Sequence, residues 1–109
     1  MKFITQTIPR AISSETDKRR PVLIVSNDIN NKAASTLTIL PVTSNVSRVY
    51  PFEVLLNPEV SGLTKPSKVQ AQQVRTISKQ RIISEIIGKL DEETMLLINV
   101  ALKLHLGLN

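Results

Sequence analysis

Short apolar runs, separated by polar and proline-containing stretches, occupy most of this chain before residue 91. The nearly continuous apolar run over residues 21–26 predicts a buried strand. Clean alternation of polar and apolar residues over 36–40 predicts a second strand, which ends close to Pro41 because proline has no N–H to donate. By the same criteria, further strands are expected over residues 51–56, 67–77 and 82–90.

Two shorter signals complete the pattern of the strands. Residues 3–8 have the β-branched content of a short strand, whereas the polar stretch that follows Pro9 is typical of a loop. Gly88, inside the last expected strand, predicts a bulge or a close approach of another part of the backbone.

The hydrophobic period changes from that of strands to that of a helix after Asp91. Asp91 is a good N-cap, and Gly107 is placed to end the helix. Apolar residues at three- and four-residue spacing predict the face that packs on the sheet: Leu96, Leu97, Val100, Ala101, Leu104 and Leu108. Several strands followed by a helix indicate an α+β domain.

The first two core strands predict a pair of side chains that suits binding of an anion. If they are antiparallel neighbours joined by a turn at residues 30–32, Arg20 at the start of one strand meets Thr43 at the end of the other. A guanidinium donates hydrogen bonds in a planar fork and stays charged at any working pH, so this pair suits an anionic group such as phosphate. The alternative is a solvated arginine at a strand end and an ordinary turn threonine.

Composition narrows the classes of function. The length of 109 residues predicts a single domain over 1–109, which dimerisation would help to stabilise. The chain has no cysteine and one histidine, so we expect no disulfide, no metal site and no cofactor. We assign no chemistry to His105. The absence of a long apolar run predicts no membrane segment and a cytoplasmic protein.

Charge points to a polyanionic partner. The net charge is +5, and basic residues gather before residue 82 while several acids lie in residues 91–93. Such asymmetry favours binding of nucleic acid, although a basic surface is also common in small soluble domains. One tyrosine and two phenylalanines are too few for a platform on which several bases stack.

Four blocks of the sequence resemble the MazF/PemK family of bacterial toxins, in order and with ordinary spacing. The likeness runs from about residue 14 to residue 108, and the blocks read Arg20-Pro-Val-Leu-Ile-Val-Ser-Asn-Asp28, Leu40-Pro-Val-Thr-Ser44, Tyr50-Pro-Phe-Glu-Val-Leu-Leu56 and Gln73-Val-Arg-Thr-Ile-Ser-Lys-Gln-Arg81. The resemblance implies an SH3-like, partly open antiparallel β-barrel with a C-terminal α-helix. It also implies a homodimer that cleaves single-stranded RNA, including mRNA, at specific sequences without metal and that a cognate antitoxin protein inhibits.

The resemblance also assigns roles to individual residues. It makes Arg20 and Thr43 the catalytic pair, with a 2′,3′-cyclic phosphate and a free 5′-hydroxyl as the product ends. Residues expected to bind the RNA are Glu15, Arg19, Ser44, Ser67 and Gln73. Ser67 and Gln73 also fit a strand-start hydroxyl and an edge amide, so their roles depend mainly on the likeness.

The N-terminal segment departs from the family pattern. Residues 1–13 do not match the usual opening block, no glycine occurs before Gly62, and Ser13 stands where the family's loop has glycine. Replacing that glycine removes backbone freedom, and loss of the usual first strand would leave a sheet edge uncovered. A shifted start or a frame change would account for such a replacement.

Two other functions remain open at this point. The first is a catalytically weakened relative that still dimerises and binds an antitoxin or nucleic acid without cleaving it. The second is an SH3-like barrel that binds DNA or RNA for regulation only, because one fold supports many functions. Thr43 discriminates between a nuclease and a binder, since a protein that reads only phosphates would tolerate Thr43→Ala.

Overall fold

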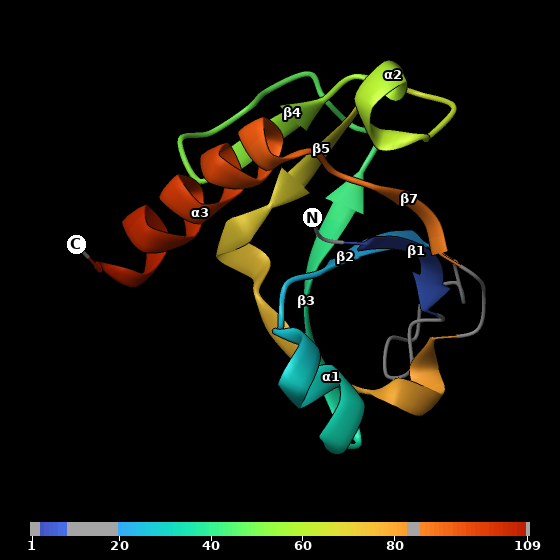
Figure 1. Cartoon of the computed structure of the whole chain (residues 1–109). Helices are drawn as coiled ribbons and strands as arrows, with labels where there is room; N and C mark the ends of the chain where they lie inside the picture. The colour runs from blue at the N-terminus through green and yellow to red at the C-terminus, as the bar shows by residue number, and fades with distance from the viewer. Residues whose placement is uncertain (1–2, 9–19, 83–85, 109) are drawn as a thin grey trace, which may run out of the picture.

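The structure is a computed structural model that describes residues 3–8, 20–82 and 86–108. Seven strands and several short helices precede one long helix in these residues (Figure 1). The elements are β1 Phe3–Ile8, β2 Arg20–Ile24, α1 Asp28–Ala33, β3 Thr36–Thr43, β4 Glu53–Leu56, α2 Pro58–Ser61, β5 Ser67–Gln70, η1 Ala71–Gln73, β6 Arg75–Ser78, η2 Lys79–Arg81, β7 Ile86–Lys89 and α3 Glu92–Leu106.

The strands form one curled antiparallel sheet, with the order β4-β5-β3-β2-β1-β7 and with β6 paired to β3. In Figure 1 the sheet bends around β3, with β4 and β5 on one side and β1, β2 and β7 on the other. Together with the C-terminal helix, this curled sheet confirms the expected α+β class and partly open barrel.

β3 is long enough to pair with two different strands along one edge. It pairs with β6 over Thr36–Ile39 and with β5 over Val42 and Thr43, and Pro41 falls between the two pairings. The single strand expected over 67–77 is therefore wrong, because η1 divides it into β5 and β6. A bond to a distant residue holds this break: the Ala71 N–H donates to the Phe52 carbonyl at 3.0 Å.

The first strand is present despite its unusual sequence. β1 pairs with β2 on one side and with β7 on the other. The first strand is therefore not lost and no edge is left uncovered there, as the β-branched content of residues 3–8 predicted. β7 covers Ile86–Lys89, and residues 83–85 of the strand expected over 82–90 lie outside the described residues.

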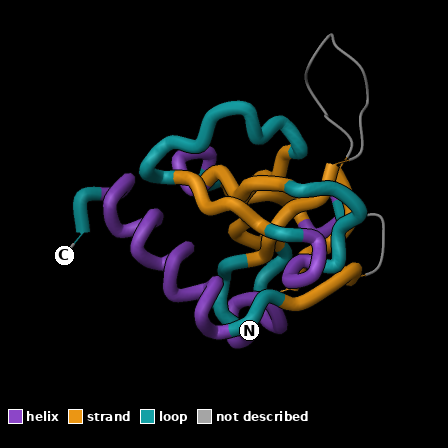
Figure 2. The backbone as a smooth tube through the Cα atoms, turned by 90° about the horizontal axis from the view of Figure 1, so that it is seen from above, coloured by secondary structure: helices purple, strands orange, loops and turns teal. Residues whose placement is uncertain are grey.

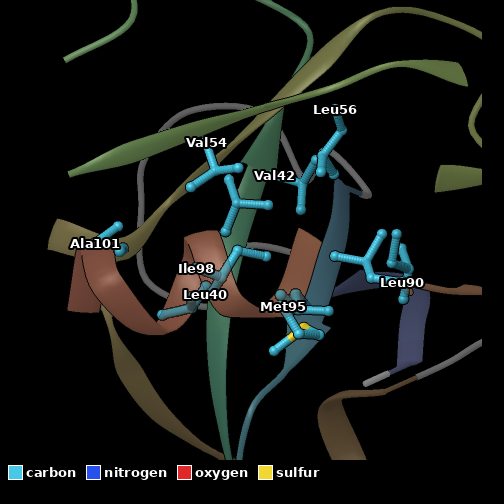
Figure 3. Packing of buried hydrophobic residues seen from close by; sticks show 12 residues of the cluster. Leu40, Val42, Val54, Leu56, Leu90, Met95, Ile98 and Ala101 are labelled. Atoms are coloured by element: carbon cyan, nitrogen blue, oxygen red, sulfur yellow. The ribbon is translucent and has the colours of Figure 1, made fainter. Parts of the chain in front are cut away.

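α3 lies along the outside of the strands (Figure 2) and buries Met95, Ile98 and Ala101. These side chains pack on strand residues such as Leu40, Val42 and Val54 in the main core (Figure 3). Except for Ala101, the expected sheet-facing set is wrong: five of its members are more than half exposed, namely Leu96, Leu97, Val100, Leu104 and Leu108.

The ends of α3 agree with the sequence. The Asp91 side chain accepts a hydrogen bond from the Thr94 N–H at 2.8 Å, and bonds from Thr94 hold the pKa of Asp91 below its usual value. Gly107 ends the helix in the left-handed conformation, with φ of 69°. None of the helices in the described ranges has the length and apolar character needed to cross a membrane.

Candidate active site

The register of β2 and β3 places Arg20 opposite Thr43. Val22 pairs with Pro41 in this antiparallel ladder, and continuing the register by two residues brings the two together. The turn expected at residues 30–32 is instead the helix α1, which the Asn27 side chain caps by accepting from the Asn30 N–H at 2.8 Å. The register is nevertheless the expected one, because Val22 pairs with Pro41 and Ile24 with Ile39.

A cavity of about 710 Å³ lies where β2 and β3 meet the loop after α2. The ends of the two strands and the residues after β3 form one side of it. This strand wall contains Arg20, Pro21, Val42, Thr43, Ser44 and Asn45.

Residues 62–65 form a second side of the cavity, together with Ser67 and Ile87. Two glycines allow this loop to approach β7. Gly62 has a φ of 78°, and a Cβ on Gly88 would lie 2.5 Å from the Ser61 carbonyl oxygen, a distance that real Cβ atoms do not tolerate. The close approach expected at Gly88 is confirmed, and it fixes the position of this loop wall beside the strands.

The charge and hydrogen-bond donors of the cavity suit an anion. Arg20 and Lys65 are both exposed cations, and no carboxylate from the described part of the chain lines the cavity with them. The Thr43 Oγ1 atom accepts from the Asn45 N–H at 3.2 Å. This bond orients the oxygen and leaves its single O–H, which donates to no other described residue, available to a ligand.

A buried ion pair holds the chain on both sides of Thr43. Lys68 lies directly opposite Thr43 on β5, and its Nζ donates to Glu53 Oε1 at 2.8 Å. The same Nζ donates to the Arg48 carbonyl at 2.6 Å, within the loop that follows Thr43. The side chains of Lys68 and Glu53 are only 9% and 1% exposed, so solvent screens this pair little.

Two more donors complete this network on Glu53. The Tyr50 N–H donates to Oε1 at 2.9 Å and the Gln72 Nε2 donates to Oε2 at 2.7 Å. Burial raises the pKa of the Glu53 carboxyl, but the bonds from Lys68, Tyr50 and Gln72 outweigh it and lower the pKa from 4.5 to about 2. The loop behind Thr43 is therefore tied to β4, β5 and η1.

The structure brings together some of the residues expected at the site and not others. Arg20, Thr43, Ser44 and Ser67 all line the cavity. Gln73 is exposed at the end of η1 and does not line it. Glu15 and Arg19 lie outside the described residues.

Sequence reasoning missed Lys65, Asn45 and the Glu53–Lys68 pair. Lys65 had one signal, a basic residue between Gly62 and Pro66 in a loop that returns to the sheet. The ion pair had another, a charged residue within each of two otherwise β-like segments. Neither signal reveals which loop lies beside which strand, because that depends on the curl of the sheet.

Residues 3–106 match the family described as the PemK-like, MazF-like toxin of type II toxin–antitoxin systems. This chain belongs to that family. The match begins at the first residue of β1, so it includes most of the N-terminal segment that departs from the usual pattern.

Similar proteins and solved structures support membership of the MazF family. The chain is 42% identical over 103 residues to Endoribonuclease MazF9 of Mycobacterium tuberculosis, which covers 90% of this chain and 86% of that protein. The solved Mycobacterium tuberculosis toxin MazF-mt6 has a TM-score of 0.79 and 26% identity, covering 96% of this chain and 98% of that one. A mycobacterial endoribonuclease in complex with its cognate antitoxin has a TM-score of 0.75 and 28% identity, over 95% and 93% of the two chains.

Proposed function

We propose that this chain is the toxin of a type II toxin–antitoxin pair and cleaves single-stranded RNA, including mRNA, at specific sequences. The observation that carries the proposal is that Arg20 and Thr43 line one cavity, and the β2–β3 register, continued from the Val22–Pro41 pair, sets them opposite each other. Its RNA substrate places the protein in the cytoplasm, and a cognate antitoxin restrains it there. Family membership and the endoribonuclease names of its relatives support the same activity.

The geometry supports a reaction in which the RNA supplies its own nucleophile. The 2′-hydroxyl oxygen forms a bond to phosphorus and the bond from phosphorus to the 5′-oxygen breaks, so the products are a 2′,3′-cyclic phosphate and a 5′-hydroxyl. One proton leaves the 2′-oxygen and one reaches the 5′-oxygen. The protein must stabilise the extra negative charge on the phosphorus oxygens between these two events.

Arg20 and Thr43 divide this task. The guanidinium, whose pKa lies above about 12, neutralises the developing charge more readily than it transfers a proton. Its side chain forms no hydrogen bond or ion pair within the described residues, so its donors are available to phosphate. The Thr43 hydroxyl donates to a second phosphate oxygen, with its orientation set by the Asn45 N–H.

Four of the other expected residues, all except Ser67, bind the RNA around the cut. Ser44 lines the cavity next to Thr43, where it contacts the nucleotide beside the cleaved linkage. Gln73 binds RNA that extends beyond the cavity, and Glu15 and Arg19 act from the segment before β2. The protein works as a homodimer, and the exposed apolar side of α3 supports this proposal.

Cleavage by two variants tests the assignment. A long RNA is incubated with purified protein in EDTA, and the initial rate of cleavage is measured. Thr43→Ala removes one donor to the transition state and lowers the rate by about 100-fold or more, and Arg20→Ala removes the cation and lowers it further.

Arg75→Ala is the matched control, because Arg75 is an exposed arginine on β6 that does not line the cavity. Its rate stays close to that of the wild type. Full activity of Arg20→Ala contradicts the assignment. RNA that stays intact with the wild type, while an acidic antitoxin segment still binds, supports the catalytically weakened relative instead.

A further inference from the structure

Lys65 is the second cation of the cavity, and the reaction described above gives it no role. It lines the loop wall, whereas Arg20 lies on the strand wall. Its side chain is exposed and forms no hydrogen bond or ion pair with another described residue. A cation that lines a cavity without a described carboxylate beside it attracts an anionic ligand.

The backbone that carries Lys65 is held by several bonds. The Gly62 N–H donates to the Pro58 carbonyl at 3.0 Å, and the Leu63 N–H donates to Ser61 Oγ at 3.1 Å. On the other side, Ser67 Oγ donates to the Lys65 carbonyl at 3.0 Å. The loop therefore delivers the lysine from a fixed position, which lowers the entropy cost of using it.

Ser67 is better placed to hold Lys65 than to bind RNA itself. Ser67 is only 4% exposed, and its single O–H already donates to the Lys65 carbonyl. Phosphate oxygens only accept hydrogen bonds, so Ser67 would have to release Lys65 before it could donate to RNA. Ser67 therefore contributes by holding the backbone of Lys65 in place.

The size of the cavity leaves room for more than the cleaved linkage. At about 710 Å³ it is within the range of pockets that enclose a drug-sized ligand, and it is far larger than one phosphate group. The partly buried apolar side chains of Leu63 and Ile87 lie in the same lining as the two cations. A ribose or base fits against these side chains while phosphates reach the cations.

We propose that Lys65 binds a second phosphodiester, the one next to the linkage at Arg20 and Thr43, and that Ser67 is a positioning residue for Lys65. This inference rests on the proposed cleavage of RNA and adds a subsite to it. Two phosphates held at fixed positions set which linkage of the strand enters the reacting position.

The first test compares Lys65→Gln with Lys32→Gln. Lys32 is an exposed lysine in α1, at the far end of the β2–β3 pair, so both variants lose one positive charge. The probe is an RNA with a 2′-deoxy nucleotide at the cut site, which binds without being cleaved. Lys65→Gln binds it roughly tenfold more weakly, because a charge-assisted hydrogen bond is lost, whereas Lys32→Gln binds as the wild type does.

Salt dependence reports the phosphate contact itself. Each phosphate neutralised on a single strand adds about 0.7 to the slope of log affinity against log salt, so Lys65→Gln lowers the slope by about that amount. A probe with a neutral methylphosphonate next to the cut site weakens binding by the wild type and leaves binding by Lys65→Gln unchanged. A general loss of structure in the variant would not produce this pattern.

Ser67→Ala separates positioning from direct contact. If Ser67 acts through Lys65, Ser67→Ala weakens binding in the wild type and has no further effect in Lys65→Gln. Equal further loss in both backgrounds overturns the positioning role. Wild-type cleavage together with Lys65→Gln behaving like Lys32→Gln overturns the phosphate subsite alone, whereas no cleavage by the wild type overturns the proposed function as well.

Discussion

Single residues around Thr43 show how the site depends on groups that do not touch the ligand. Asn45 orients the Thr43 hydroxyl through its N–H, and Lys68 faces Thr43 from β5. Lys68 is tied in turn to Glu53 and to the Arg48 carbonyl. The Glu53–Lys68 pair thus fixes both the strand beside Thr43 and the loop after it.

Glu53→Gln removes the charge of one partner of this buried pair. It leaves the ammonium of Lys68 buried without a counter-charge, and we expect a loss of about 3 kcal/mol in the free energy of unfolding at pH 7. Glu59→Gln, on the exposed acid of α2, is the control and changes this free energy little. The measurement is denaturant unfolding followed by circular dichroism, and an equal effect of the two substitutions would rule out a stabilising pair.

The destabilisation by Glu53→Gln also depends on pH. The carboxyl has a pKa of about 2 in the folded protein and an ordinary value of 4.5, so its stabilising effect is present above pH 4.5. The effect is lost as pH falls from 4.5 towards 2, because in that range the unfolded chain takes up a proton that the folded carboxylate does not. The gap between wild type and Glu53→Gln therefore narrows over that range, and a constant gap would contradict the lowered pKa.

Among the elements, the sequence pattern predicted those whose boundaries are set by residues nearby in the sequence. Asp91 and Gly107 marked the ends of α3, and apolar runs marked the cores of β2 and β3. The pattern failed where a distant contact decides the structure. The break between β5 and β6 depends on a bond from Ala71 to Phe52, and nothing local in residues 67–77 signals it.

α3 was also predicted with its faces exchanged. The helix has two apolar sides, and periodicity cannot tell which of them meets the sheet. Met95, Ile98 and Ala101 pack in the core, while the stripe of Leu96, Leu97, Val100, Leu104 and Leu108 faces outward. Leucines more than half exposed at this spacing mark a surface that another molecule covers.

We expect that a second copy of this chain covers this stripe. Around a two-fold axis the stripe meets itself, and its apolar residues need no complementary charge on the partner. Leu97→Glu combined with Val100→Glu places like charges at such an interface, so the protein sediments as a monomer instead of a dimer.

Leu55→Glu is the control for the stripe, because Leu55 is 50% exposed on β4 and lies outside α3. This variant stays dimeric in sedimentation analysis. A dimer that survives both charges on α3, or a loss of antitoxin binding alone, would show that the stripe serves a different partner.

At the scale of the whole molecule, the curl of the sheet assembles the site from distant parts of the chain. β2 and β3 supply Arg20 and Thr43, and the loop after α2 supplies Lys65 to the same cavity. Sequence predicted the first two because antiparallel pairing fixes their register. It could not predict the third, since the approach of residues 62–65 depends on how Gly62 packs against β7.

The chemical identity of the cut ends tests the central claim most directly. Wild-type protein is incubated in EDTA with an RNA and with the same RNA carrying 2′-deoxy nucleotides at the mapped cut sites, and the ends are analysed. The account predicts 5′-hydroxyl ends that a kinase labels without prior phosphatase treatment, 2′,3′-cyclic phosphates opposite them, and no cleavage of the deoxy-substituted RNA. Ends that carry a 5′-phosphate, or cleavage at the deoxy positions, would contradict it.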